Sequence, residues 1–172
     1  MQLAIAVHSS LNKELEDKIR KFLENLKCNP TILVGGYWGG MKVVVDEAIK
    51  KKLKVVVILP EEREDVELPQ DVIRINSGCE YRCRSVILVR SSNLLVSLGG
   101  EVGTTIEIFM AYAMGKRALV LSDTGFSTDK LKTAFPEYLD NRRVMKVEYY
   151  SSPEDLAKEV CKPITQIKTN FG

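Results

Sequence analysis

The sequence predicts an α/β protein of the Rossmann-like kind, a three-layer fold with helices on both faces of a mostly parallel sheet of about six to seven strands. Strand-like and helix-like segments alternate along the whole chain. The strand-like segments are continuously apolar, which is typical of parallel strands buried on both faces. Two of these strands run directly into glycine-rich turns, at Gly35–Gly40 and Gly99–Thr105.

Length and composition fit a single domain over residues 1–172, with a loose tail from residue 162. A chain of 172 residues with 45% hydrophobic and 28% charged residues can bury a sizeable core. The net charge is only +2 and no basic stripe is present, which argues against a nucleic-acid partner. The apolar start at Met1–Val7 lacks a basic region, and no apolar stretch has membrane-spanning length, so we expect a cytoplasmic protein.

Apolar runs define the strands, and apolar residues at helical spacing define the helices. The expected strands are residues 3–7, 31–34, 54–59, 72–75, 94–98, 117–121 and 144–147. The expected helices are residues 15–26, 41–51, 81–91, 105–114, 129–134 and 153–160.

Local signals support the ends of several elements. Leu15, Ile19 and Phe22 lie on one face of the first helix, and Asn29-Pro30 ends it. Glu61–Pro69 is polar and acidic, which is typical of a surface loop. Gly115 is placed to cap the helix before it. Pro153 stands in the first turn of the last helix, where proline is favoured.

The helix at Thr105–Met114 is apolar on almost every side. A helix of this kind has to be buried all round, and its own sheet covers only one side. We therefore expect its other side to meet a second copy of the chain in a twofold homodimer.

The four cysteines do not have the spacing of a zinc site. Cys79 and Cys83 are four residues apart, and Cys28 and Cys161 are far from them and from each other. We expect free thiols in a reducing compartment and no metal, with disulfides as the alternative if the source is a hyperthermophile.

Both glycine turns connect the end of a strand to the start of a helix. Glycine lets the backbone approach a ligand closely, and the helix N-terminus supplies free N–H groups and a positive dipole end. Ligands of open α/β sheets bind at the carboxyl ends of the strands. Neither turn has the pattern of a P-loop or of a dinucleotide fingerprint. The two turns together still predict a site for a phosphate-containing ligand, whereas either turn alone would equally fit a tight connection.

Two stretches of the chain resemble a known family. Val96–Glu107 looks like the Pro-Gly-Gly-x-Gly-Thr-x-x-Glu motif of the Lonely Guy (LOG) family, and Gly35–Met41 is similar to that family's first glycine loop, Gly-Gly-Gly-x-x-Gly-Leu-Met-Gly. The resemblance covers roughly residues 2–160. The wider SLOG superfamily includes LOG phosphoribohydrolases, molybdenum-cofactor carrier proteins and the DNA-processing protein DprA.

The resemblance implies a Rossmann-like fold, a phosphate-containing ligand and a homodimer. LOG enzymes cleave the N-glycosidic bond of a nucleoside 5′-monophosphate to free base and ribose 5-phosphate, and no cofactor is required. The residues that match the family's binding loops, together with the serine pair after the first strand, form the expected ligand and phosphate site. They are Ser9, Ser10, Gly35, Gly36, Gly39, Gly40, Met41, Gly99, Gly100, Gly103, Thr104 and Thr105.

The resemblance also implies a catalytic pair, Arg84 and Glu107. A carboxylate near the sugar stabilises an oxocarbenium-like centre or activates water. Glu107 lies in an otherwise apolar helix, so burying it requires a partner, and Arg84 is the natural one. Arg90 is the alternative partner, or a phosphate ligand. A purely structural ion pair is the remaining interpretation.

Some positions depart from the LOG pattern. Gly99 replaces the proline, Glu101 replaces a glycine, Ser85 stands in place of a lysine, and Asn93 in place of an aspartate. These departures favour the alternative of a non-catalytic carrier that binds a nucleotide or a molybdopterin-type cofactor. The lysine-decarboxylase label attached to some such sequences has no support, because no lysine stands out as a Schiff-base residue.

A few further residues lie at strand ends. His8 is the only histidine, and we expect it to be incidental to catalysis. Tyr37 and Trp38 lie between the glycines, where a ring could stack on a base or cover the sheet edge or a dimer contact. Asp123 and Gly125 are further candidates for the pocket wall.

Overall fold

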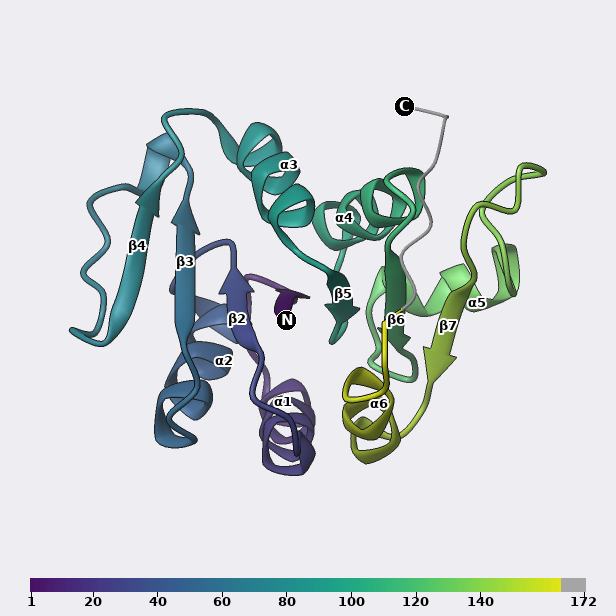
Figure 1. The fold of residues 1–172 in the computed structure, drawn as a ribbon, viewed down its shortest axis with the longest axis horizontal. Coiled ribbons are helices and arrows are strands. Elements are labelled where there is room, and N and C mark those ends of the chain that lie inside the picture. The colour runs from purple at the N-terminus through teal and green to yellow at the C-terminus, as the bar shows by residue number, and fades with distance from the viewer. Residues whose placement is uncertain (165–172) are drawn as a thin grey trace.

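The computed structural model describes residues 1–164 of the chain. Seven strands form one sheet in the order β4-β3-β2-β1-β5-β6-β7, and every neighbouring pair is parallel (Figure 1). The strands are β1 (Gln2–Ala6), β2 (Thr31–Val34), β3 (Val55–Leu59), β4 (Val72–Asn76), β5 (Leu94–Ser97), β6 (Arg117–Leu121) and β7 (Val147–Tyr150). The predicted fold class is confirmed.

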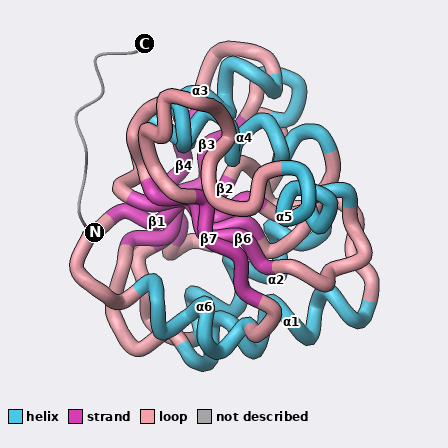
Figure 2. The backbone as a smooth tube through the Cα atoms, turned by 90° about the vertical axis from the view of Figure 1, so that its right-hand side faces the viewer, coloured by secondary structure: helices cyan, strands magenta, loops and turns pink. Residues whose placement is uncertain are grey.

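Helices cover both faces of this sheet (Figure 2). They are α1 (Lys13–Asn25), α2 (Gly39–Lys50), α3 (Tyr81–Ser91), α4 (Val102–Ala113), α5 (Leu131–Ala134) and α6 (Pro153–Val160), with 3-10 turns η1 (Glu61–Arg63) and η2 (Ser127–Lys130). Helices α1, α2 and α6 lie on one face, and α3, α4 and α5 lie on the other. No helix among residues 1–164 is long and apolar enough to cross a membrane.

The alternating side chains of each strand divide the core in two. Leu3 and Ile5 of β1 pack toward α1, α2 and α6, whereas Ala4 and Ala6 of the same strand pack toward α3 and α4. Both sets are almost fully buried. This is the reason why the strands are continuously apolar in sequence: each residue of a central strand faces one of two cores.

The chain order places a crevice in the middle of the sheet. The first four strands run outward from β1, and the chain then returns to place β5 on the other side of β1. Such a reversal separates the loops that follow the two central strands and leaves a crevice at their carboxyl ends. A hydrogen bond from the His8 N–H to the Gly99 carbonyl, 3.0 Å long, joins the two loops there.

Several predicted boundaries differ from the structure by one to three residues. The strand expected at residues 144–147 is β7 at Val147–Tyr150, because Val144 and Met145 pack as a loop against the core on the α4 side. The helices expected from residues 41 and 105 begin at Gly39 and Val102 instead. Glycines and a polar N-terminal turn hid these starts from the apolar periodicity. The loose tail expected from residue 162 lies mainly outside the described residues.

The expectation of free thiols is wrong for this structure. Cys28 is bonded to Cys161, and Cys79 is bonded to Cys83. The first pair joins the chain just after α1 to the end of α6, and these two helices pack against each other. Sequence spacing could not show this proximity, because the two cysteines are 133 residues apart.

Candidate active site

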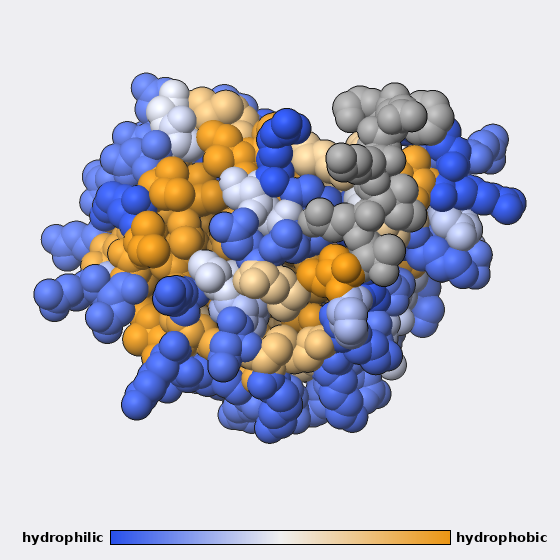
Figure 3. Space-filling model, viewed as in Figure 1, coloured by the Kyte–Doolittle hydropathy of each residue, from blue (hydrophilic) through white to orange (hydrophobic). Residues whose placement is uncertain are grey.

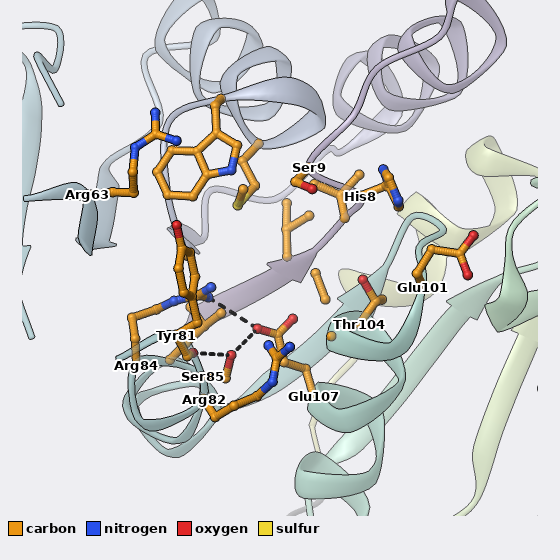
Figure 4. Close-up of a pocket in the computed structure, with 18 residues that line it drawn as sticks. His8, Ser9, Arg63, Tyr81, Arg82, Arg84, Ser85, Glu101, Thr104 and Glu107 are labelled. Atoms are coloured by element: carbon orange, nitrogen blue, oxygen red, sulfur yellow. Dashed lines mark hydrogen bonds and ion pairs between the residues drawn. The ribbon is translucent and has the colours of Figure 1, made fainter. Parts of the chain in front are cut away.

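A pocket of about 480 Å³ opens at the carboxyl edge of the sheet, over the crevice between β1 and β5. Its walls come from the loops after β1 and β2, from η1, and from the N-terminal turns of α3 and α4 (Figure 4). Seven predicted site residues contribute to these walls. They are Ser9, Gly35, Met41, Arg84, Gly103, Thr104 and Glu107.

The other predicted site residues are not part of the pocket wall. They are Ser10, Gly36, Gly39, Gly40, Gly99, Gly100 and Thr105. Two of these glycines have backbone conformations that other residues rarely adopt, with φ of +52° at Gly39 and +105° at Gly99. A Cβ at Gly39 would lie 1.9 Å from the Ser9 carbonyl oxygen. These glycines allow the pocket loops to pack together closely.

The N-terminus of α4 points into the pocket. Gly103 and Thr104, in its first turn, line the wall. The first N–H groups of a helix have no acceptor within the helix, and the helix dipole makes this end positive. The turn therefore has the chemistry of an anion site.

Glu101 does not occupy that anion site. Its side chain turns away from Glu107 in Figure 4, and its carboxylate accepts a hydrogen bond from the Ser127 hydroxyl. The negative charge that departs from the LOG pattern is thus directed toward η2, although Glu101 still lines one edge of the pocket.

Arg84 and Glu107 form a buried ion pair on the pocket wall. Arg84 Nη1 lies 3.2 Å from Glu107 Oε1, and the Ser85 hydroxyl donates to the same oxygen at 2.8 Å. Arg84 is 7% exposed and Glu107 is 6% exposed. Arg90 is exposed on α3 and is not the partner of Glu107.

The environment of the pair is poor in water and rich in cations. Burial raises the pKa of the Glu107 carboxyl above its ordinary value, and the Arg84 guanidinium and the Ser85 hydroxyl oppose this rise. Arg84 Nε is buried and has no hydrogen-bond partner among residues 1–164. Within those residues, no cluster of His, Cys, Asp and Glu could hold a metal ion.

The pocket is also lined by two cations that the sequence analysis does not predict. Arg82 reaches from α3, and its Nη1 lies 3.6 Å from the position that a Cβ of Gly103 would take. The guanidinium of Arg82 makes no hydrogen bond or ion pair with the described residues. Arg63 of η1 stacks on Trp38, with its Cζ 4.6 Å from the ring centroid. Tyr81 completes this wall.

The position of these cations in the chain was the only sequence signal for them. Arg63 follows β3 and Arg82 opens α3, so both lie on connections that leave the carboxyl edge of the sheet. The acidic composition of the loop after β3 predicts a surface loop. Applying the strand-end rule to it would have identified Arg63.

The aromatic candidates fill different roles. Trp38 lines the pocket, but the Tyr37 hydroxyl donates to Asp46 at 2.8 Å and does not face the pocket. His8 also lines the pocket and stacks on Phe126, with ring centroids 4.8 Å apart. Asp123 and Gly125 are not part of the pocket wall.

Comparisons with known proteins place these observations in a family. The model of the SLOG cluster4 family matches residues 16–157. The crystal structure of TM1055, a structural-genomics target, is 30% identical in sequence to this chain. The superposition covers 92% of this chain and 97% of that one, with a TM-score of 0.84. The molybdenum cofactor binding protein of the phototrophic bacterium Rippkaea orientalis is 21% identical, with 94% and 97% coverage and a TM-score of 0.72.

A sequence relative was also found among archaeal proteins. A protein of Archaeoglobus fulgidus, described as uncharacterized, is 36% identical over 91 residues. The match takes in 52% of this chain and spans 58% of that relative. The family model covers most of the elements that build the pocket, from α1 to α6. The chain belongs to the SLOG cluster4 family.

Proposed function

We propose that this protein binds a nucleotide-type ligand and holds its phosphate at the N-terminus of α4. The observation that carries the proposal is the open pocket in which Gly103 and Thr104 meet the guanidinium of Arg82, which has no ion-pair partner among residues 1–164. Helix N–H groups and a guanidinium are both strong phosphate donors, and the low dielectric of a pocket strengthens their effect. The remaining predicted glycines hold the two loops in place around this site.

The base and ribose of such a ligand would occupy the opposite end of the pocket. Trp38 offers an aromatic surface there, and Arg63 already lies on its ring. A base would stack in place of the Arg63 guanidinium or against it. Ser9 and Met41, from the loop after β1 and the first turn of α2, complete the proposed ligand wall.

We further propose that the protein hydrolyses nucleoside 5′-monophosphates at the N-glycosidic bond. The supporting observation is that Arg84 and Glu107 line the same pocket as the proposed phosphate site. The bond between ribose C1′ and the base nitrogen breaks as a water oxygen bonds to C1′. Glu107 accepts one proton of the water and later releases it to solvent, and the departing base nitrogen takes up one proton from solvent, so the net reaction adds one water. Water is the sole co-reactant, so no cofactor is required.

A carrier without catalysis is the second candidate. It is favoured by the near-complete burial of Arg84 and Glu107, which already satisfy each other. The R. orientalis structure is that of a molybdenum cofactor binding protein. In this case the pocket would hold a nucleotide or a molybdopterin-type ligand, and the Arg84–Glu107 pair would only support its wall.

We also propose that the protein is a homodimer. Seven large hydrophobic residues are exposed among residues 1–164, and five of them lie on the side of the sheet that carries α3 and α4. They are Ile73, Ile75, Val86, Val102 and Phe109. Figure 3 shows apolar surface gathered where β3, β4 and α3 lie. A second copy would cover this surface.

The test is an assay of the purified protein with a panel of nucleoside 5′-monophosphates, measuring free base and ribose 5-phosphate. We expect base release by the wild type and its loss in Glu107→Gln, which keeps the size of the side chain. Thr104→Val, which removes a hydroxyl at the proposed phosphate site, should raise KM more than it lowers kcat. A ligand that raises the Tm without any base release would replace the hydrolase with the carrier.

A further inference from the structure

Gly35 faces the guanidinium of Arg84 at very short range. It follows the last residue of β2, and a Cβ built on it would lie 1.6 Å from Arg84 Nη1 and 2.3 Å from Cζ. The third atom of the group, Nη2, would be 3.0 Å away. No side chain larger than hydrogen fits at this position while Arg84 keeps its place.

The requirement for glycine at this position is steric. Gly35 is not among the residues with positive φ, so its backbone conformation is open to other residues. Its neighbour Gly36 meets a different group, since a Cβ there would lie 2.4 Å from the Trp38 ring. The two adjacent glycines thus make room for two different pocket side chains.

Among residues 1–164, the hydrogen-bond partner of the Arg84 guanidinium is Glu107. Its hydrogen bond within the described residues runs from Nη1 to Glu107, at 3.2 Å, and its Nε has no partner. Few hydrogen bonds therefore fix the position of this group. The surface of Gly35 supplies the wall against which it packs.

We propose that Gly35 is a positioning residue. Because it has no side chain, the Arg84 guanidinium packs directly against it and is held close to Glu107. The catalytic consequence rests on the proposed hydrolysis, but the steric relation does not. A methyl group at position 35 would push the flexible end of Arg84 away and leave the backbone in place. The buried Glu107 carboxylate would then keep only its hydrogen bond from Ser85.

A double-mutant cycle tests this relation without any substrate. The variants are Gly35→Ala, Arg84→Ala and their combination, and the measured quantity is the midpoint of urea unfolding. We expect Gly35→Ala to lower the midpoint clearly when Arg84 is present and only slightly when residue 84 is alanine, because the clash is then gone. Equal shifts in both backgrounds would overturn the proposal.

Gly36→Ala is the matched control. The methyl group there meets Trp38 instead of Arg84, so its shift of the midpoint should be the same with and without Arg84. If Gly36→Ala couples to Arg84 as strongly as Gly35→Ala does, the effect belongs to the whole loop and the positioning role of Gly35 is refuted.

Measuring kcat and KM distinguishes the positioning role of Gly35 from the proposed hydrolysis. If the protein hydrolyses a nucleoside 5′-monophosphate, Gly35→Ala should lower kcat about 100-fold with little change in KM, because the phosphate site on α4 is untouched. If Gly35→Ala and Arg84→Ala couple in unfolding but the wild type hydrolyses no substrate, the positioning role of Gly35 is kept and the hydrolase is refuted. If the protein hydrolyses its substrate but Gly35→Ala and Arg84→Ala do not couple in unfolding, the positioning role of Gly35 is refuted and the hydrolase is kept. The same holds if kcat is unchanged in Gly35→Ala.

Discussion

Ser85 and Glu107 meet in a buried part of the pocket wall. Ser85 is 2% exposed and its hydroxyl donates to Glu107 Oε1 at 2.8 Å, whereas the Arg84 contact to the same oxygen is 3.2 Å. Charge-assisted hydrogen bonds are normally shorter than this Arg84 contact. The serine is therefore a close partner of the carboxylate, at a position where the LOG pattern has a lysine.

We predict that Ser85→Ala lowers the free energy of unfolding by about 2 kcal/mol, because it leaves a buried charged acceptor short of one donor. Urea unfolding at neutral pH measures this quantity. Ser92→Ala is the control, since Ser92 is as buried but donates to the neutral Val89 carbonyl, and it should cost about 1 kcal/mol. A smaller loss in Ser85→Ala than in Ser92→Ala would contradict this account.

Tyr149 gives a prediction about alkaline pH. Burial raises the pKa of its hydroxyl to about 12 from an ordinary value of 10.0, and the hydroxyl donates to the Phe135 carbonyl. The folded state keeps this proton more tightly than the unfolded state does. The resulting stability is complete below pH 10 and disappears as the pH rises toward 12.

The free energy of unfolding of Tyr149→Phe should therefore fall less between pH 10 and pH 12 than that of the wild type. Chemical unfolding at several pH values provides the comparison. Tyr150 also has a raised pKa, but it is present in both proteins and cancels. Parallel pH profiles for the two proteins would show that Tyr149 does not contribute.

The contact between Arg84 and Glu107 could be predicted from the sequence. Arg84 and Glu107 came from the resemblance to a motif, and their pairing followed from the cost of a lone buried charge. Arg63, Arg82 and Tyr81 were missed because single basic or aromatic residues on connecting segments look like ordinary surface. Only the folded sheet brings their segments to the same edge.

At the scale of elements, the central strands and the helices with clear apolar faces were predicted closely. In α1, the Asn12 side chain accepts a hydrogen bond from the Leu15 N–H at 2.8 Å, and the apolar face begins at Leu15. The last strand was displaced because Val144 and Met145 look like a strand but pack as a loop. The Cys28–Cys161 disulfide depends on how two distant elements meet, and sequence spacing carries no signal for that.

The two disulfides should differ in their effect on stability. Cys28–Cys161 closes a long loop, with a separation of 133 residues, and Cys79–Cys83 closes a short one, with a separation of 4. The loop-closure model gives about 5 kcal/mol for the first and about 2 kcal/mol for the second. The free energies of unfolding of Cys28→Ser/Cys161→Ser and Cys79→Ser/Cys83→Ser should follow this order.

Urea unfolding of each double variant beside the wild type checks this order, and each variant serves as the other's control. A larger loss for Cys79→Ser/Cys83→Ser would mean that the short bridge supports α3 and the pocket wall beyond its effect on the unfolded chain. Such a result would contradict the loop-closure account.

At the scale of the whole molecule, the exposed apolar residues on the α3 and α4 side lead to a prediction about assembly. We expect a dimer of twice 19.3 kDa by size-exclusion chromatography with light scattering. Phe109 of α4 is 38% exposed and contacts Phe135 edge to face. Phe109→Glu would place a charge in the proposed interface and should give monomers.

Leu11→Glu is the control for this experiment. Leu11 is 40% exposed, but it lies in the loop between β1 and α1, away from the proposed interface. This variant should remain a dimer. A wild-type monomer, or the same dissociation in both variants, would remove the proposed interface.

The fold as a whole explains why one pocket gathers these side chains. The order of strands opens a crevice at the carboxyl ends of β1 and β5, and the returning chain carries α3 and α4 to the same edge. The strand-end rule and the glycine turns predicted a ligand site at this edge of the sheet, although not the order of the strands. It could not predict that the Arg82 guanidinium reaches the pocket or that the Glu101 carboxylate turns toward Ser127, because both depend on side-chain packing.

The binding of a phosphate-bearing ligand is the central claim, and calorimetric titration of Glu107→Gln tests it most directly, because this variant should not consume the ligand. The titrants are the nucleoside 5′-monophosphates and the matching nucleosides. We predict that at least one monophosphate binds about 10-fold or more tightly than its nucleoside, and that Arg82→Ala removes most of the difference. Equal binding of nucleoside and monophosphate, or no binding of any pair, would contradict the claim.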